Sequence, residues 1–363
     1  MFLSHRSSAV HSDIVAGANG ISGGAIIDHL VKQPDSPISS SLRGVRSSLS
    51  APTQEFDSLQ STSYDRLRRL LSRSGVLCKN VTHAFFPSYV HDNDFSVLHV
   101  KNGPLFRNFL EATDLACPGL KRVVLQTGGK DTPRYTGPEN IVYYEQEDDL
   151  FAIQKRRNIW NYNIIRPWGI IGFSWQYLGI NETLPIGQYF LICRELGEAP
   201  RWPGTLKSWH RVESQSFAPG IADLTIWAAT HDQCKDEAFK HVDSDVIFWK
   251  HLWHLLAEYF KAPMADFEAP AEETKSFDMA EWAKDKKSTW EKIVARSGGD
   301  AEVFQLEDFA LMNWYITPSL QKGPFPGTSG KARDLGWQRS DDTYHAWLGT
   351  MRAYENAGVL PMS

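Results

Sequence analysis

Three glycines near the N-terminus constrain the fold of this chain more than any other feature. Gly17, Gly20 and Gly23 follow a short apolar run that ends at Val15, and they precede a segment with helical apolar spacing at 25–32. Residues without a Cβ let the backbone turn tightly and approach a phosphate group, whose charge the free N–H groups of the next helix then meet. A strand, a glycine turn and a helix in this order favour a dinucleotide-binding unit. A purely structural turn is the alternative.

Strand and helix patterns alternate through the first half of the chain. Apolar and β-branched runs at 81–86, 120–126 and 163–167 predict strands, and the segments 95–112 and 144–157 have helical spacing. Such alternation favours an α/β fold, a Rossmann-like doubly wound parallel sheet with helices on its faces.

Two further elements are expected between the glycine turn and these strands. A strand is predicted at 41–45 and a helix at 64–73. After Pro167 the pattern changes, because Trp, Gly and Pro become frequent and helices dominate. We therefore expect a nucleotide-binding Rossmann domain over 1–167 and a mostly helical C-terminal substrate-binding cap over 168–363, some segments of which return to the sheet.

Composition narrows the class of protein. The chain has 363 residues, of which 42% are hydrophobic, and a formal net charge of -5, so it has no basic footprint for nucleic acid. Its four cysteines are widely spaced and form no C-x-x-C pair, which favours free thiols in a reducing compartment over disulfides or a metal site. No apolar run is long enough to span a membrane and no signal peptide is evident, so we expect a cytoplasmic protein that acts on a small molecule. A homodimer is left open.

The end of the expected second strand bears on the choice of cofactor. This region usually carries an acid when the ribose of NAD is bound and an arginine when the 2′-phosphate of NADP is bound. Here Arg46 and Ser47 occupy it and no carboxylate is present, which favours NADP. The alternative is an ordinary exposed loop arginine.

A tyrosine and a lysine could supply acid chemistry. Lys130 lies just beyond a predicted strand, where ligands bind in open α/β sheets, and Tyr143 lies near the start of a predicted helix. An ammonium group next to a phenol stabilises the phenolate, so the tyrosine can protonate a developing oxyanion. The Tyr-x-x-x-Lys pattern of ordinary short-chain dehydrogenases is absent, because Glu147 stands four residues after Tyr143. A packing role for the tyrosine is the alternative.

Nearly the whole chain resembles the progesterone 5β-reductase and iridoid synthase-like family, an atypical branch of the extended short-chain dehydrogenases/reductases. The segment 86–91 is similar to members from fungi, which often belong to secondary metabolism. Besides the glycine turn, the resemblance rests on Val81-Thr82-His83-Ala84-Phe85-Phe86, Leu105-Phe106-Arg107-Asn108-Phe109-Leu110, Leu125-Gln126-Thr127-Gly128-Gly129-Lys130, Tyr143-Tyr144, Glu147-Asp148, Arg166-Pro167, Gly172-Phe173-Ser174 and Phe248-Trp249-Lys250-His251.

The resemblance implies NADPH as the cofactor and places the family's catalytic pair on Lys130 and Tyr143. It also implies that Tyr89, Trp168 and Phe173 help to line the substrate pocket. Trp168 stands where many members have glycine after Arg-Pro, a difference that would put a large indole near the nicotinamide. The residues that the resemblance implies for cofactor binding are Gly17, Asn19, Gly20, Ile21, Gly23, Arg46, Ser47, Asp57, Ser88, Lys130, Tyr143, Pro167 and Ile170. No metal site is expected.

The activity that follows is reduction by NADPH of an enone, an enal or a ketone in a bulky apolar metabolite. Electrostatic stabilisation of the enolate by Tyr143 would be the largest catalytic contribution. Two alternatives share the same fold. One is a cyclase, isomerase or pericyclase without net redox chemistry, favoured by the unusual Arg46-Ser47 pair and the short Lys130–Tyr143 connection. The other is an inactive cofactor-sensing regulator, which would not need Tyr143 and Lys130.

Overall fold

The computed structural model describes most of the chain. The strand expected at 41–45, the helix expected at 64–73 and the site residues Arg46, Ser47, Asp57 and Lys130 lie outside the described residues. The described ranges are 2–6, 11–32, 78–92, 94–129, 138–174, 181–263, 278–316 and 326–363.

A six-stranded sheet forms the centre of the described structure, and it confirms the predicted doubly wound parallel architecture. All neighbours from β2 to β9 pair in parallel, whereas the edge strand β1 runs antiparallel to β2. The antiparallel edge was not predicted. In spatial order the strands are β1 (Phe2–Arg6), β2 (His11–Val15), β3 (Val81–Phe86), β4 (Arg122–Gln126), β5 (Asn161–Pro167) and β9 (Glu237–His241).

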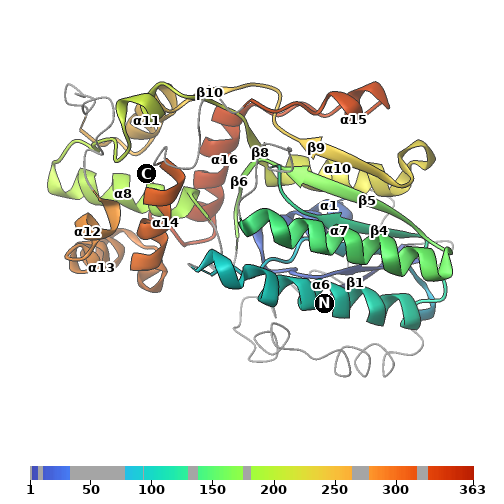
Figure 1. The fold of residues 1–363 in the computed structure, drawn as a ribbon. Helices are drawn as coiled ribbons and strands as arrows, with labels where there is room; N and C mark the ends of the chain where they lie inside the picture. The colour runs from blue at the N-terminus through green and yellow to red at the C-terminus, as the bar shows by residue number, and fades with distance from the viewer. Residues whose placement is uncertain are drawn as a thin grey trace.

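Helices cover both faces of the sheet (Figure 1). On one face α1 (Ile21–Lys32) packs beside α10 (Ala218–Thr230), and on the other α6 (Leu98–Ala116) packs beside α7 (Pro138–Arg157). Successive residues of a strand point to opposite faces of the sheet. Because helices cover both faces, the central strands are apolar on both sides. Val124 accordingly joins the core under α1 and α10, while its neighbour Val123 joins the core under α6.

Two helices begin earlier than the sequence predicts. The helix α1 begins at Ile21 rather than at residue 25, and α7 begins at Pro138 rather than at residue 144. In α1 the missing turn contains Gly23 and Gly24, which have the lowest helix propensity after proline. Tertiary packing therefore overrides local propensity at the point where the glycine turn enters the helix.

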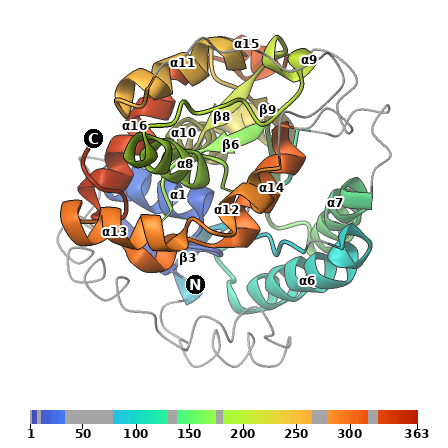
Figure 2. The ribbon, with the colours of Figure 1, turned by 90° about the vertical axis from the view of Figure 1, so that its left-hand side faces the viewer.

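A second group of helices gathers at one end of the sheet. Figure 2, which looks from that end, shows these helices in front of the sheet, with α6 and α7 to one side. Their shared core is aromatic and includes the fully buried Trp202, Trp249, Trp253, Trp290 and Trp347. The helices are α8 (Thr183–Leu196), α9 (Leu206–Trp209), α11 (Trp249–Tyr259), α12 (Met279–Ala283), α13 (Lys287–Ser297), α14 (Leu306–Ile316) and α16 (Thr343–Asn356).

The remaining elements connect this group to the sheet. The strands β6 and β8 form one parallel pair and β7 and β10 one antiparallel pair, while α15 lies against β9. Because β9 and α10 also come from the second half of the chain, that half contributes to the sheet as well as to the helical group. The division at residue 167 stays a prediction. The remaining elements are β6 (Gly169–Ile171), β7 (Val212–Glu213), β8 (Gln215–Phe217), β10 (Ile247–Phe248) and α15 (Gly330–Asp334).

Buried polar groups fix the helical group to the short strands. Gln215 donates to Glu182 at 2.9 Å and accepts from the Trp347 indole at 2.6 Å. Burial, followed by the charge of the Glu213 carboxylate, raises the pKa of Glu182 well above its usual range. Arg211 pairs with Glu213 at 2.6 Å, and both side chains are buried. Removing either partner would leave the other buried charge unpaired, which is strongly destabilising. The Arg211–Glu213 pair therefore favours this arrangement of the short strands.

His241, the last residue of β9, lies fully buried beside two carboxylates. Asp243 and Asp341 come within 4.8 Å of it and of one another. Asp341 accepts two hydrogen bonds from Arg339, at 2.8 and 3.0 Å, so its charge is already paired. Burial, followed by the charges of Arg339 and Arg333, lowers the pKa of His241 to about 3. The imidazole is therefore neutral in the folded protein.

This depressed pKa predicts an acid-dependent loss of stability. The unfolded imidazole has a pKa near 6.5, so the stability that His241 contributes is present above pH 6.5 and is lost as the pH falls toward about 3. We expect the melting temperature of His241→Gln to decline less between pH 6.5 and pH 4 than that of the wild type. His345→Gln, at an exposed position, controls for the loss of an imidazole. Parallel melting curves for His241→Gln and wild type would contradict this expectation.

Asp243 acts in the opposite direction. Burial raises its pKa to about 7, so its contribution is present below the unfolded pKa of 3.8 and is lost as the pH rises through 7. Both changes take place between about pH 3 and pH 7 and have opposite signs, so His241→Gln should flatten the fall in stability toward acid, whereas Asp243→Asn should steepen it.

Candidate active site

The glycine turn lies at the carboxyl end of β2 and leads directly into α1. Gly17 has a φ of 62°, a conformation that favours glycine, and its carbonyl accepts the N–H of Gly20 at 3.0 Å. A Cβ on Gly23 would lie 2.0 Å from that carbonyl oxygen, so α1 starts in direct contact with the turn. The N–H groups of the first turn of α1 have no partner within the helix and are available to an anion.

Two other segments meet this turn. A Cβ on Gly17 would lie 2.6 Å from Oγ of Ser88, which follows β3. The Ser174 hydroxyl donates to the carbonyl of Asn19 at 3.2 Å, and a Cβ on Gly172 would lie 3.0 Å from the Ile21 side chain. The predicted residues Gly17, Asn19, Ile21 and Ser88 therefore lie together, where ligands bind in sheets of this kind.

Tyr143 lies over the end of β4. A Cβ on Gly128 would come within 3.0 Å of the Tyr143 ring and 3.2 Å of its hydroxyl oxygen. Gly128 precedes Lys130 by two residues, so the phenol lies against the backbone that leads to the lysine. The rings of Tyr89 and Tyr143 have centroids 6.4 Å apart. The adjacent Tyr144 is 45% exposed, so α7 turns only the first of the two tyrosines toward the strand end.

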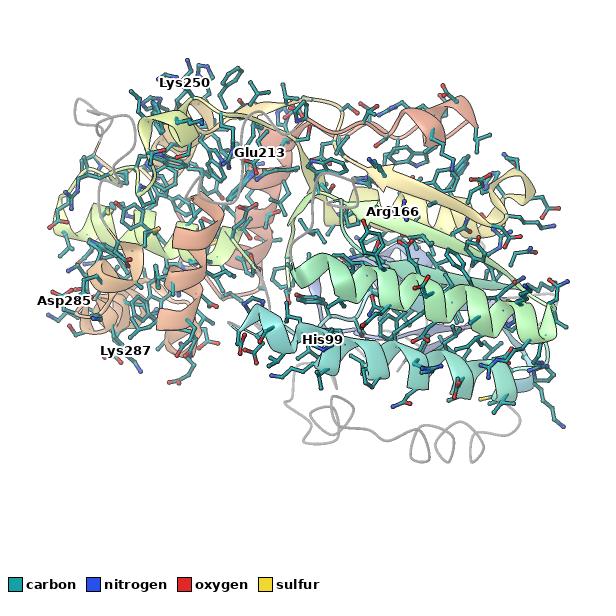
Figure 3. All side chains as sticks on the ribbon, viewed as in Figure 1. His99, Arg166, Glu213, Lys250, Asp285 and Lys287 are labelled. Atoms are coloured by element: carbon teal, nitrogen blue, oxygen red, sulfur yellow. The ribbon has the colours of Figure 1, made fainter. Side chains whose placement is uncertain are left out.

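An ion pair sets the orientation of α7. Glu147, one helical turn after Tyr143, accepts two hydrogen bonds at 2.8 Å from one Arg166 nitrogen, one through each carboxylate oxygen. Arg166 belongs to β5, and Figure 3 labels it where β5 passes next to α7. The position that carries lysine in ordinary short-chain dehydrogenases thus carries a carboxylate that is paired with an arginine of the sheet.

Asn102 on α6 holds the loop that carries Tyr89. Its side-chain oxygen accepts the N–H of Val90 at 2.8 Å, and its side-chain nitrogen donates to the carbonyl of Val90 at 2.9 Å and to that of Leu98 at 3.0 Å. Asn102 is fully buried. The loop between β3 and α6 is therefore fixed on its helix side.

The end of β5 and the residues that follow it pack against the turn after β4. The Pro167 carbonyl accepts the N–H of Gly129 at 2.6 Å, and the indole of Trp168 contacts Gly129. Ile170, in β6, packs on the core beneath α1 and α10. Phe173 lies against Tyr354, with ring centroids 4.9 Å apart, and borders the aromatic core of the helical group rather than Tyr143.

Sequence reasoning did not assign several residues that shape this site. Gly128 and Gly129 belong to a sequence motif, but nothing in the motif indicates that both residues contact aromatic rings. Asn102 stands alone inside a helical segment, and nothing in its surroundings signals a partner twelve residues away. All four cysteines are buried and free of disulfides, and none of the described helices is long and apolar enough to cross a membrane.

Comparison with known proteins identifies the family. Residues 130–303 match the model of the PRISE-like Rossmann-fold domain. The chain is 34% identical to the short chain dehydrogenase gsfE of Penicillium aethiopicum, over 96% of this chain and 98% of that one. The chain belongs to the PRISE-like family of short-chain dehydrogenases/reductases.

Other PRISE-like relatives come from plants. The chain is 31% identical to a 3-oxo-Delta(4,5)-steroid 5-beta-reductase of Arabidopsis thaliana, over 76% of this chain and 74% of that one. It is 30% identical to an (S)-8-oxocitronellyl enol synthase of Nepeta racemosa, with the same coverage. Among solved structures, the fold is similar to a UDP-glucose 4-epimerase of Thermotoga maritima, with a TM-score of 0.59 and 12% identity over 95% of this chain and 99% of that one.

The glycine turn offers a matched pair of substitutions. Gly23→Ala places a Cβ 2.0 Å from the Gly17 carbonyl oxygen, whereas a Cβ on the adjacent Gly24 meets its nearest neighbour at an ordinary 3.5 Å. We expect Gly23→Ala to lower the melting temperature and weaken nucleotide binding. Gly24→Ala should be neutral or stabilising by up to about 1 kcal/mol, because alanine favours helix. Equal melting temperatures and equal binding in the two variants would refute this account of the turn.

The Asn102 anchor is tested by removing its side chain. Asn102→Ala leaves the N–H and carbonyl of Val90 without partners, which should reduce the free energy of unfolding by about 1–3 kcal/mol for each buried group left unsatisfied. Asn108→Ala is the control, since that side chain on the same helix makes no hydrogen bond with any described residue and is only half-buried. Chemical denaturation measures both, and a similar small effect in both variants would contradict the role of Asn102.

Proposed function

We propose that this chain is an NADPH-dependent reductase of an enone, an enal or a ketone in a bulky apolar metabolite. The observation that carries the proposal is the position of Tyr143, whose hydroxyl lies against Gly128 at the end of β4, two residues before Lys130. The glycine turn lies at the same edge of the sheet. The names of the relatives agree, since they include a dehydrogenase and a steroid 5-beta-reductase.

The glycine turn fits a dinucleotide. Gly17 adopts the left-handed backbone that the tight turn needs, and the N-terminus of α1, from Ile21 on, supplies N–H donors to a pyrophosphate. A UDP-glucose 4-epimerase of Thermus thermophilus, similar in fold, was solved in complex with NAD. For this chain we favour NADPH because Arg46 and Ser47 suit a 2′-phosphate better than a bare ribose.

Three other proposed cofactor contacts belong to described segments at the same edge: Ser88 follows β3, Pro167 ends β5 and Ile170 lies in β6. Asp57, which lies outside the described residues, would contact the adenine. Asn19 and Gly23 shape the turn itself. When bound, NADPH would supply a hydride to the β-carbon of the enone or to the carbonyl carbon of a ketone.

Tyr143 would hold the carbonyl oxygen of the substrate. As the hydride arrives, negative charge develops on that oxygen, and the phenol O–H donates a hydrogen bond or a proton to it. The ammonium group of Lys130 would stabilise the phenolate that remains. Tyr89, whose ring centroid lies 6.4 Å from that of Tyr143, would contribute an apolar wall for the substrate.

The decisive variant is Tyr143→Phe, compared with Tyr144→Phe. Removing one hydroxyl from Tyr143 should reduce kcat by about 10²–10⁴-fold, the usual contribution of a positioned general acid. Binding of NADPH, measured by nicotinamide fluorescence, and the melting temperature should stay close to wild type. Tyr144 is exposed and turned away from the strand end, so Tyr144→Phe should retain full activity. Lys130→Met should resemble Tyr143→Phe.

Product analysis with deuterium-labelled NADPH tests the reaction type. Transfer of one deuterium to product for each NADPH oxidised supports the reductase, and the labelled carbon separates enone from ketone reduction. Product formed without oxidation of NADPH would contradict the proposal and support the alternative, a cyclase, isomerase or pericyclase without net redox chemistry. Wild-type turnover in both Tyr143→Phe and Lys130→Met would remove the assigned catalytic pair.

A further inference from the structure

The indole of Trp168 is enclosed by two glycines. A Cβ on Gly129 would lie 2.3 Å from Cε3 and 2.7 Å from Cζ3 of the ring, and a Cβ on Gly327 would lie 2.9 Å from Cε2 and 3.0 Å from Cζ2. These two pairs of atoms form opposite bonds of the six-membered ring. A side chain at Gly129 would require the indole to move, and one at Gly327 would crowd both the indole and Val242, whose Cγ1 would lie 2.6 Å from the added Cβ.

Two serine side chains hold the backbone of Trp168 and the segment at Gly327. The N–H of Trp168 donates to the Ser216 hydroxyl at 2.9 Å, and that hydroxyl donates to the carbonyl of His241 at 2.6 Å. The N–H of Gly327 donates to the Ser214 hydroxyl at 3.0 Å. β8 and the end of β9 thus hold the backbone of the tryptophan, and the residue just before β8 holds the segment on the other side of the indole.

The near side of the indole supports the turn after β4. Gly128 and Gly129 are consecutive, and their missing Cβ atoms are replaced by different rings, Tyr143 at Gly128 and Trp168 at Gly129. The N–H of Gly129 is also tied to the Pro167 carbonyl, one residue before the tryptophan. The turn is therefore clamped between the phenol and the indole.

We infer that Trp168 is a positioning residue, which holds the Gly128–Gly129 turn against the Tyr143 ring and so fixes the surroundings of the Tyr143 hydroxyl. Its catalytic consequence rests on the proposed function, whereas its packing does not. This differs from a role as a pocket wall, because a wall residue would change substrate affinity and leave the Tyr143 geometry unchanged. It also explains why this chain combines glycine at 129 and at 327 with a tryptophan at 168.

The test is a double-mutant cycle between Trp168 and Gly129. Trp168→Ala removes the support, and we expect kcat to fall by about 10²-fold, the typical effect of a 1 Å misplacement of reacting groups. The Kd for NADPH should change little, and Trp168→Phe should recover most of the activity. Gly129→Ala should impair the protein in the presence of the indole, and adding Trp168→Ala should relieve that effect, which is a non-additive coupling. Gly349→Ala, with open space around its Cβ, is the control for a new methyl group.

Different outcomes separate the packing from the reaction. Additive changes in melting temperature across the cycle would overturn the inference, as would a raised KM with unchanged kcat in Trp168→Ala. If the wild type oxidised no NADPH with any enone or ketone, the proposed function would fail, and the melting cycle would still decide the packing. A crystal structure of Trp168→Ala with Gly128 and Tyr143 in their original places would overturn the positioning role independently of any turnover.

Discussion

Close approach of side chains to backbone at the carboxyl ends of the strands is the constraint on which the site depends. Four glycines make it possible, and a specific group fills the place of each missing Cβ: Ser88 at Gly17, a carbonyl oxygen at Gly23, a phenol at Gly128 and an indole at Gly129. Three loops and the start of a helix converge there. Any larger residue would push one of them away from the edge where the ligand is expected.

Strands β2 to β5 could be predicted because the middle of the sheet is buried on both faces. Strands such as β4 are apolar at successive positions, which a parallel sheet between helices requires. The two outer strands of the described sheet, β1 and β9, were not predicted, since each mixes polar with apolar residues and pairs on one side only. The predicted start of α1 was also wrong, because the first turn of this helix consists of residues with low helix propensity that tertiary contacts hold in place.

The site was only partly accessible to sequence reasoning. Gly17 and Tyr143 stand in recognisable patterns, and the structure places both at the expected edge. The contacts that fix them join residues far apart in the sequence, as in the pairs Glu147–Arg166 and Gly129–Trp168. No periodicity encodes such pairs, because they arise only when the strands are aligned in register.

The pairing of Glu147 with Arg166 has a consequence for the proposed chemistry. A lysine four residues after the tyrosine would be held in place by the helix itself, since both side chains would share one face. Here that face carries a carboxylate already bound to β5, so under the proposed function the cation that tunes Tyr143 would come from Lys130. The position of a residue after a strand depends on the turn that carries it. Under that proposal, the packing of the Gly128–Gly129 turn between two aromatic rings would replace the rigidity that a helix gives to the tyrosine–lysine pair of ordinary short-chain dehydrogenases.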